Sequence, residues 1–158
     1  MAKKKKKDVS NIAAQNRKAR HNYYIEDTVE AGIMLTGTEV KSLRAGRANI
    51  IDAYAAEKDG GLYLLNAHIS EFEQGNRFNH APLRPRKLLV HKKEQQRLFV
   101  QTNKKGFTLV PLDIHFNDRG YAKVTLGIGK GKQHYDKRAS EKDREWKRDQ
   151  SRLLRDRG

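Results

Sequence analysis

The 158-residue sequence contains no cysteine. This absence excludes a disulfide framework and any zinc site with cysteine ligands. No apolar run approaches the roughly 18 residues that a membrane-spanning helix requires. The opening MAKKKKK also has no apolar segment behind it of the kind that a secretory signal contains. We therefore expect a soluble, intracellular protein, and the length favours a single domain.

Patterns typical of catalysis and metal binding are also missing. The six histidines show neither H-x-x-x-H nor H-E-x-x-H spacing, and the carboxylates are not grouped as a two-metal nuclease requires. The stretch GIGKGKQ (127–133) resembles a phosphate-binding loop, but Leu126 stands where that pattern needs its first glycine. Gln133 stands where the pattern needs serine or threonine. Nothing in the sequence therefore indicates an enzyme, a cofactor or a metal ion.

Positive charge is what the sequence has in excess. Its 34 lysines and arginines and 19 acidic residues give a net charge of +15, and such a charge attracts polyanions, above all nucleic acids. The charge is concentrated at the two ends, whereas the apolar residues are concentrated between them. We therefore predict a disordered basic N-terminal arm (1–11), a domain with its own core (12–135) and a basic C-terminal tail (136–158).

The clearest pattern within the domain predicts a β-hairpin. Apolar and polar residues alternate over 110–116 and again over 121–128, and the turn sequence Asn117–Gly120 lies between them. Pro111 indicates that the first strand lies at a sheet edge or contains a bulge. The outward face of the second strand is predicted to consist of Tyr121, Lys123 and Thr125.

Further strands precede this hairpin. Residues 22–35 have the alternation of a strand, which we expect to bend near Gly32. Residues 53–57 and 62–69 flank the turn sequence Asp59–Gly61, which predicts a second hairpin.

Two short helices interrupt these strands. Thr36 and Glu39 have the spacing of a capping box, and Gly46 stands where a helix C-cap glycine belongs. A second helix is predicted over 91–102. Several short strands with few helices indicate a mainly β fold, a small antiparallel barrel that is closed or partly closed.

The C-terminal tail is unusual for a basic tail. Of its 23 residues, 15 are charged, so it has little apolar surface with which to stabilise a helix. We therefore expect the tail to be unfolded alone. Oppositely charged residues at helical spacing predict that it becomes helical on an RNA-rich surface. A solvated tail that only improves solubility is the alternative. Trp146 argues against that alternative, because a tail without a partner has little use for a lone tryptophan.

Several stretches, in their order along the chain, carry a resemblance to a known family. They are 16–26 (NRKARHNYYIE), 30–50 (EAGIMLTGTEVKSLRAGRANI), 84–94 (RPRKLLVHKKE), 130–138 (KGKQHYDKR) and 144–146 (REW). These stretches closely resemble the SsrA-binding protein family, also called small protein B. The resemblance extends over nearly the whole chain.

The resemblance implies a fold and a function. Family members are bacterial cytoplasmic proteins with a barrel of the oligonucleotide-binding (OB) type, short helices and a disordered basic tail. They bind transfer-messenger RNA (SsrA RNA) and, with elongation factor Tu and GTP, deliver it to stalled ribosomes for trans-translation. The barrel binds the tRNA-like domain of that RNA, and the tail enters the decoding centre and the mRNA channel. The family implies no enzyme activity and no cofactor, and we expect a monomer.

The resemblance also implies functional residues. In the domain, the RNA-binding positions are Asn16, Arg17, Lys18, Arg20, Glu30, Leu89 and Lys123. In the tail, the positions that act at the decoding centre are Gly131, Lys132, Tyr135, Asp136, Lys137, Arg138 and Trp146. Tyr135 departs from the family pattern, in which many members have histidine. An aromatic ring that stacks on a base survives this change, whereas a required imidazole proton does not.

Glu30 leaves two interpretations open, because an acidic side chain does not bind phosphate. Its carboxylate either accepts hydrogen bonds from a base edge or a ribose 2′-hydroxyl, or forms an ion pair that orients a nearby arginine. Two other functions also stay open. One is a generic OB-fold RNA-binding or ribosomal protein, and the other is a small nuclease or RNA-modifying enzyme.

Overall fold

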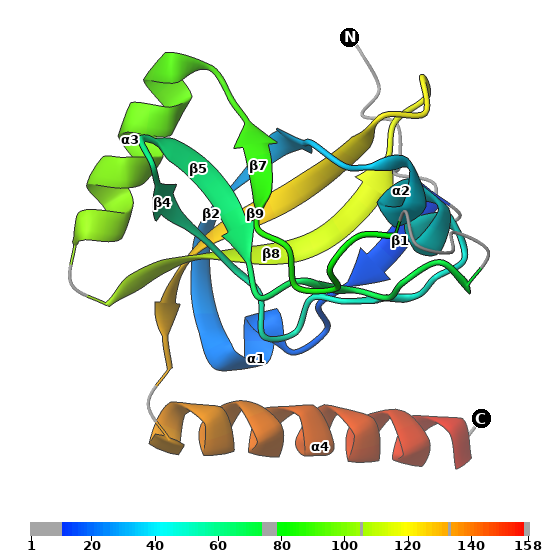
Figure 1. Cartoon of the computed structure of the whole chain (residues 1–158). Coiled ribbons are helices and arrows are strands. Elements are labelled where there is room, and N and C mark those ends of the chain that lie inside the picture. Colours follow the sequence, from blue (N-terminus) through cyan, green and yellow to red (C-terminus); the bar gives the residue numbers. More distant parts are fainter. Residues whose placement is uncertain (1–10, 74–78, 105, 133, 157–158) are drawn as a thin grey trace, which may run out of the picture.

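The structure is a computed structural model (Figure 1). It describes residues 11–73, 79–104, 106–132 and 134–156, apart from the side chains of 134–137, 139, 140 and 156. The strands are β1 (Ile12–Gln15), β2 (Tyr23–Ile33), β3 (Ala48–Asn49), β4 (Tyr54–Lys58), β5 (Gly61–Leu65), β6 (His68–Ile69), β7 (Arg86–Leu89), β8 (Phe107–Phe116) and β9 (Ala122–Gly131). The helices are α1 (Ala19–Asn22), α2 (Gly37–Arg44), α3 (Lys92–Asn103) and α4 (His134–Asp156).

Most of the strands close into a barrel. The main sheet has the order β1-β8-β4-β5-β7-β2-β9, and β9 also pairs with β8, so the strands from β8 round to β9 form a ring. Every pair in this ring is antiparallel. Strand β1 adds to β8, and the short strands β3 and β6 form a second sheet. The prediction of a mainly β fold with a small antiparallel barrel is confirmed.

The predicted hairpin is formed by β8 and β9. These strands pair from Phe107 opposite Lys130 to Phe116 opposite Ala122, and the register shifts just after Pro111. This shift is the bulge that the proline indicated. In the turn, Asn117 Oδ1 accepts hydrogen bonds from the following backbone N–H groups of Arg119 and Tyr121, at 3.1 and 2.9 Å.

The second hairpin is formed by β4 and β5, and its second strand is shorter than predicted. Asp59 and Gly60 both have positive φ, 50° and 77°, which is the conformation of a two-residue hairpin turn. Strand β5 ends at Leu65 because Asn66 also has a positive φ, 57°, and interrupts the extended chain. The remaining residues of the predicted strand include β6.

Strand β2 links two neighbours of the barrel. It pairs with β9 over most of its length and with β7 at its end, and Gly32 lies opposite both Lys123 and Leu89. A Cβ atom on Gly32 would lie 3.2 Å from the Cβ of Leu89, so the absent side chain permits the close approach of the strands. The register shift lies between Ile25 and Asp27, earlier than the bend we predicted at Gly32.

Both predicted helices are present, as α2 and α3. The backbone N–H of Thr36 donates to Glu39 Oε1 at 2.9 Å, and Gly46 has a φ of 72° after the end of α2. The two helices lie on opposite sides of the barrel, α3 on the left and α2 on the right in Figure 1. Leu98 of α3 and Leu43 of α2 are buried with the apolar residues of the strands. Each helix therefore packs one apolar face against the barrel.

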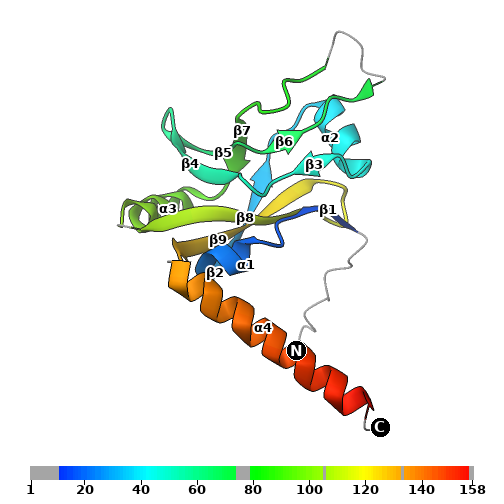
Figure 2. The same ribbon diagram turned by 90° about the horizontal axis from the view of Figure 1, so that it is seen from below.

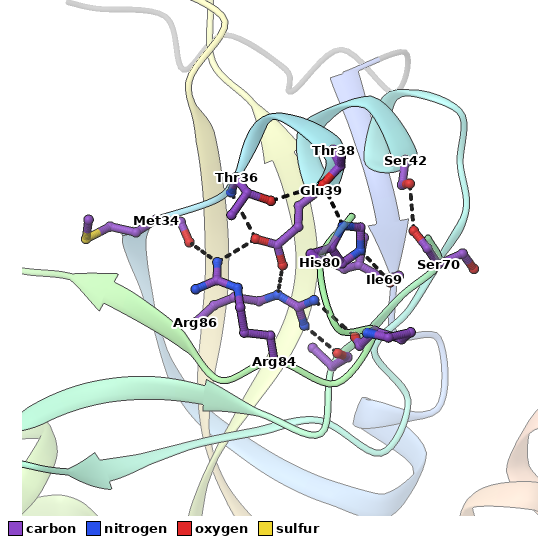
Figure 3. Close-up of polar contacts among 12 residues, drawn as sticks. Met34, Thr36, Thr38, Glu39, Ser42, Ile69, Ser70, His80, Arg84 and Arg86 are labelled. Atoms are coloured by element: carbon purple, nitrogen blue, oxygen red, sulfur yellow. Dashed lines mark hydrogen bonds and ion pairs between the residues drawn. The ribbon is translucent and has the colours of Figure 1, made fainter. Parts of the chain in front are cut away.

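A buried ion-pair network fixes the start of β7 (Figure 3). Glu39 and Arg86 are both fully buried, and Arg86 Nε donates to Glu39 Oε2. Arg84 Nη2 donates to Glu39 Oε1 at 2.5 Å, and the other Arg86 nitrogens donate to two backbone carbonyl groups. Because Arg86 is the first residue of β7, this network sets the position of the strand that ends at Leu89.

The tail differs from its prediction. We expected it to be unfolded alone, whereas residues 134–156 form the single helix α4. This helix runs along the outside of the barrel in both views (Figures 1 and 2), and its described side chains are exposed. Its many glutamate, lysine and arginine residues have high helix propensity, and oppositely charged residues three apart attract one another. These local effects favour the helix without a large apolar contact.

Candidate nucleic-acid interface

A cleft on the outer face of the barrel brings together three of the predicted RNA-binding residues. Its volume is about 670 Å³, and Glu30, Leu89 and Lys123 all contribute to its lining. The three residues come from β2, β7 and β9, which are adjacent strands. Gly32 pairs with Leu89 on one side and with Lys123 on the other. The Leu89 and Lys123 side chains therefore lie on either side of a glycine, which has no side chain.

Leu89 faces outward because of the alternation in β7. Arg86 and Leu88 are buried, whereas Lys87 and Leu89 are exposed. The side chain of Leu89 is 51% exposed, which gives the cleft an apolar surface beside its charged groups. Such a surface fits the face of an unstacked base, as proteins that recognise single-stranded RNA require.

Cations also line the cleft. Lys123 is half-buried on β9, and Arg97 extends from α3 at the opposite wall. Arg97 forms ion pairs with Asp27 and with Glu94, the latter at 3.4 Å. Both ion pairs involve partly exposed groups, so water screens them and phosphate competes for the guanidinium. Sequence reasoning missed Arg97, and its place in a basic helix directly after the RKLL stretch was the signal that could have found it.

Glu30 contacts a histidine and not an arginine. Its Oε2 lies 3.3 Å from Nε2 of His115, so in the interpretation that gives Glu30 an ion pair the partner is this histidine. The Glu30 side chain is half exposed, and it also lines the cleft. Its carboxylate can therefore accept a hydrogen bond from a ligand while it keeps the contact with His115.

The predicted residues at 16–20 lie in a separate place. Asn16 is only 6% exposed, and its Nδ2 donates to the backbone carbonyls of Pro111 and Ile50 at 3.2 and 3.4 Å. Its amide nitrogen therefore links the end of β1 to the backbone at Pro111 and Ile50. The neighbouring cations are exposed, and they are Arg17, Lys18 and Arg20.

The junction of barrel and tail lies beside this second group. The Lys132 backbone N–H donates to the carbonyl of Asn22 at 2.9 Å, and its Nζ donates to the carbonyl of Arg20 at 3.1 Å. Lys132 Nζ also lies 4.8 Å from the centroid of the Tyr24 ring. Gly131, the last residue of β9, pairs with Tyr23. The tail thus leaves the barrel next to the exposed cations around α1.

The remaining predicted tail residues lie within α4. Arg138 and Trp146 are exposed, and the Trp146 side chain is 63% accessible. Tyr135, Asp136 and Lys137 belong to the first turns of the helix, but their side chains lie outside the described atoms. Near the start of the helix, Glu141 Oε1 lies 3.4 Å from Nε2 of His21.

Two further features bear on function. Among the residues that the structure describes, no group of three or more histidine, aspartate or glutamate residues is arranged to hold a metal ion. Of the described helices, none combines the length and the apolar character needed to cross a membrane.

Known proteins resemble this chain over most of its length. A family model described as SmpB protein matches residues 13–156. The SsrA-binding protein of Bradyrhizobium sp. (strain BTAi1) is 55% identical over 158 residues, which is 100% of both chains. The SsrA-binding protein of Symbiobacterium thermophilum is 61% identical over 144 residues, or 91% of each chain. That of Brucella canis is 54% identical over 158 residues, again 100% of both.

A solved structure is similar in fold as well as in sequence. It is described as "tmRNA-SmpB: a journey to the center of the bacterial ribosome", and it matches with a TM-score of 0.65 and 54% sequence identity. The match covers 76% of this chain and 84% of that chain. Family model, full-length relatives and fold agree, and the chain belongs to the SmpB protein family.

Proposed function

We propose that this protein binds transfer-messenger RNA and delivers it to stalled ribosomes for trans-translation. Its full-length similarity to SsrA-binding proteins supports the RNA partner. The similar structure, whose description names tmRNA, SmpB and the bacterial ribosome, supports the ribosome as the second partner. The function is one of binding, so it assigns no catalytic residue.

The observation that best supports this proposal within the structure is the convergence of Glu30, Leu89 and Lys123 on one cleft. The cleft offers an acceptor, an apolar surface and a cation. A folded RNA presents ribose hydroxyls for the acceptor, unstacked bases for the apolar surface and phosphates for the cation. Sequence-specific readout of a duplex groove is not needed for such a site.

We propose a division of labour between barrel and tail. The barrel binds the tRNA-like domain of the RNA through the cleft and the cations around α1. Helix α4 enters the decoding centre and the mRNA channel, where its exposed cations meet ribosomal RNA. We further propose that the protein acts as a monomer in the cytoplasm, and that elongation factor Tu with GTP joins through the RNA.

A competition experiment tests the RNA specificity. The purified protein is titrated against the labelled tRNA-like domain of transfer-messenger RNA, and unlabelled tRNA is then added as competitor. We expect tRNA to compete poorly, because the proposed partner is transfer-messenger RNA. Equal competition by both RNAs would favour a generic OB-fold RNA-binding or ribosomal protein instead.

A further inference from the structure

Glu30 belongs to a chain of polar side chains that continues beyond the cleft. Its Oε2 lies 3.3 Å from His115 Nε2, and Nδ1 of the same ring lies 2.6 Å from Asp113 Oδ1. Asp113 Oδ1 also accepts a hydrogen bond of 3.0 Å from Thr125 Oγ1. The imidazole ring is therefore held between two carboxylates, and one of these lines the cleft.

Strand register explains why these side chains meet. Strand β9 lies between β2 and β8, and Thr125 is opposite Glu30 on one side and Asp113 on the other. Lys123 is likewise opposite His115 on β8. Side chains of paired residues project to the same face of a sheet. The chain of contacts and the RNA-binding cleft therefore share one face of the barrel.

Burial differs along the chain of contacts. The side chains of His115 and Asp113 are 8% and 16% exposed, whereas that of Glu30 is 51% exposed. A half-exposed glutamate samples several rotamers, and fixing one of them costs conformational entropy when a ligand binds. Contact with a buried ring that Asp113 anchors reduces this cost before the RNA arrives.

Charged side chains surround the His115 ring. Glu30 faces the ring from β2, Asp113 from β8 and Lys123 from β9, while Ile12, its partner on β1, has no charge. The imidazole has two ring nitrogens, and one lies beside each carboxylate. The ring therefore links the buried Asp113 to the half-exposed Glu30.

We propose that His115 is a positioning residue for RNA binding, whose ring is fixed by Asp113 and holds the Glu30 carboxylate in its RNA-binding orientation. This inference rests on the proposed function and deepens it. It predicts that substitution of His115 weakens binding of transfer-messenger RNA only while Glu30 is present.

The test measures binding of the tRNA-like domain of transfer-messenger RNA at neutral pH. His115→Gln should weaken binding about tenfold, as expected for the loss of a hydrogen bond to a charged group. His80→Gln is the matched control. His80 is also buried and has two hydrogen-bond partners, but it lies near Thr38 and Ile69, away from the cleft.

A double-mutant cycle separates positioning from general stability. If His115 acts through Glu30, the double variant of Glu30→Gln and His115→Gln loses about as much affinity as either single variant. A double variant whose loss of affinity is the product of the two single losses would overturn the proposal. So would an equal loss of affinity in the control variant His80→Gln.

A second variant covers the case in which His115→Gln does not fold. Asp113→Asn removes the carboxylate that anchors the ring, so affinity should fall in the presence of Glu30 and change little in the Glu30→Gln background. Unchanged affinity in the single variant would overturn the proposal. Failure of the unmodified protein to bind the RNA at any pH would instead count against the proposed function.

Discussion

Leu88 and Leu89 are consecutive residues of β7, but their side chains lie in different environments. Leu88 is 1% exposed and belongs to the core, whereas Leu89 is 51% exposed and lines the cleft. Alternation along a strand accounts for this difference. Leu89 therefore lies beside Glu30 and Lys123 on the surface of the cleft.

Replacing Leu89 tests the apolar part of the cleft. Leu89→Ala should weaken binding of the tRNA-like domain about tenfold, because the apolar contact with a base is lost. Filter binding or fluorescence anisotropy measures the effect. Leu83→Ala is the matched control, since Leu83 is equally exposed, at 56%, but lies outside the cleft. A similar loss in both variants would remove Leu89 from the binding surface.

Glu39 makes the stability of the fold dependent on pH. Burial raises the pKa of Glu39, but hydrogen bonds from Arg84, the Thr36 backbone and Arg86 outweigh burial, so the pKa lies below its usual value. A carboxyl group with a lowered pKa stabilises the fold above its unfolded-state pKa. That stabilisation is lost as the pH falls through the folded-state pKa.

Glu39→Gln tests this network. At neutral pH the substitution should lower the free energy of unfolding by about 3–5 kcal/mol, because Arg86 is left buried without its counter-charge. The difference from the unmodified protein should begin to shrink below the unfolded-state pKa of about 4.3 and should disappear as the pH falls through the lower folded-state pKa of Glu39. Urea unfolding at several pH values measures both effects. Glu73→Gln, in an exposed pair with Arg47, is the control and should change little.

Sequence reasoning placed some site residues well and others poorly. The outward position of Lys123 followed from alternation within one hairpin, which is a local property. The burial of Asn16 and the contact of Glu30 with His115 did not follow. Both depend on register between strands distant in the chain: Asn16 contacts Pro111 and Glu30 contacts His115. Long-range register is not contained in a local pattern.

The strands and helices likewise divide into those that a local pattern predicts and those that depend on distant partners. Both hairpins, α2 and α3 were predictable because turn sequences and capping residues mark them locally. Strands β1 and β7 have only four residues each, so alternation alone does not distinguish them from loops. They are strands because β8, β2 and β5 provide hydrogen-bonding partners. Helix α4 was expected only with a partner, because its sequence has little apolar surface with which to pack.

Truncation after Arg138 tests the separate roles of barrel and tail. Affinity for transfer-messenger RNA should change little, because the cleft and the cations around α1 remain. Peptide tagging on stalled ribosomes should be abolished, since most of α4 is removed. RNA binding is measured by titration, and tagging is measured in a translation system that stalls on messages without a stop codon. Equal loss of both activities would contradict separate roles.

The net charge of +15 has an uneven distribution that matches two RNA partners. Within the described residues, exposed cations occur around α1 and along α4, and Lys123 and Arg97 line the cleft between β2, β7, α3 and β9. Each cation that neutralises a phosphate releases counterions, which makes binding sensitive to salt. The affinity of the intact protein for RNA should therefore fall steeply as the salt concentration rises.

Lys123→Gln tests how much one lysine contributes to the salt dependence of RNA binding. A plot of the logarithm of the binding constant against that of the salt concentration should lose about one unit of slope, as expected for one phosphate contact. Lys58→Gln is the control, since Lys58 is exposed on β4 and is not among the residues that line the cleft. An unchanged slope for Lys123→Gln would mean that its side chain does not contact phosphate.

Identification of the RNA bound in the cell tests the proposed function as a whole. The tagged protein is purified from its own cytoplasm, and the co-purifying RNA is sequenced, in parallel with a variant that combines Glu30→Gln, Leu89→Ala and Lys123→Gln. We predict that transfer-messenger RNA is strongly enriched with the unmodified protein and lost with the variant. Enrichment of ribosomal or mixed RNA alone, or equal enrichment with both proteins, would contradict recognition of transfer-messenger RNA by this cleft.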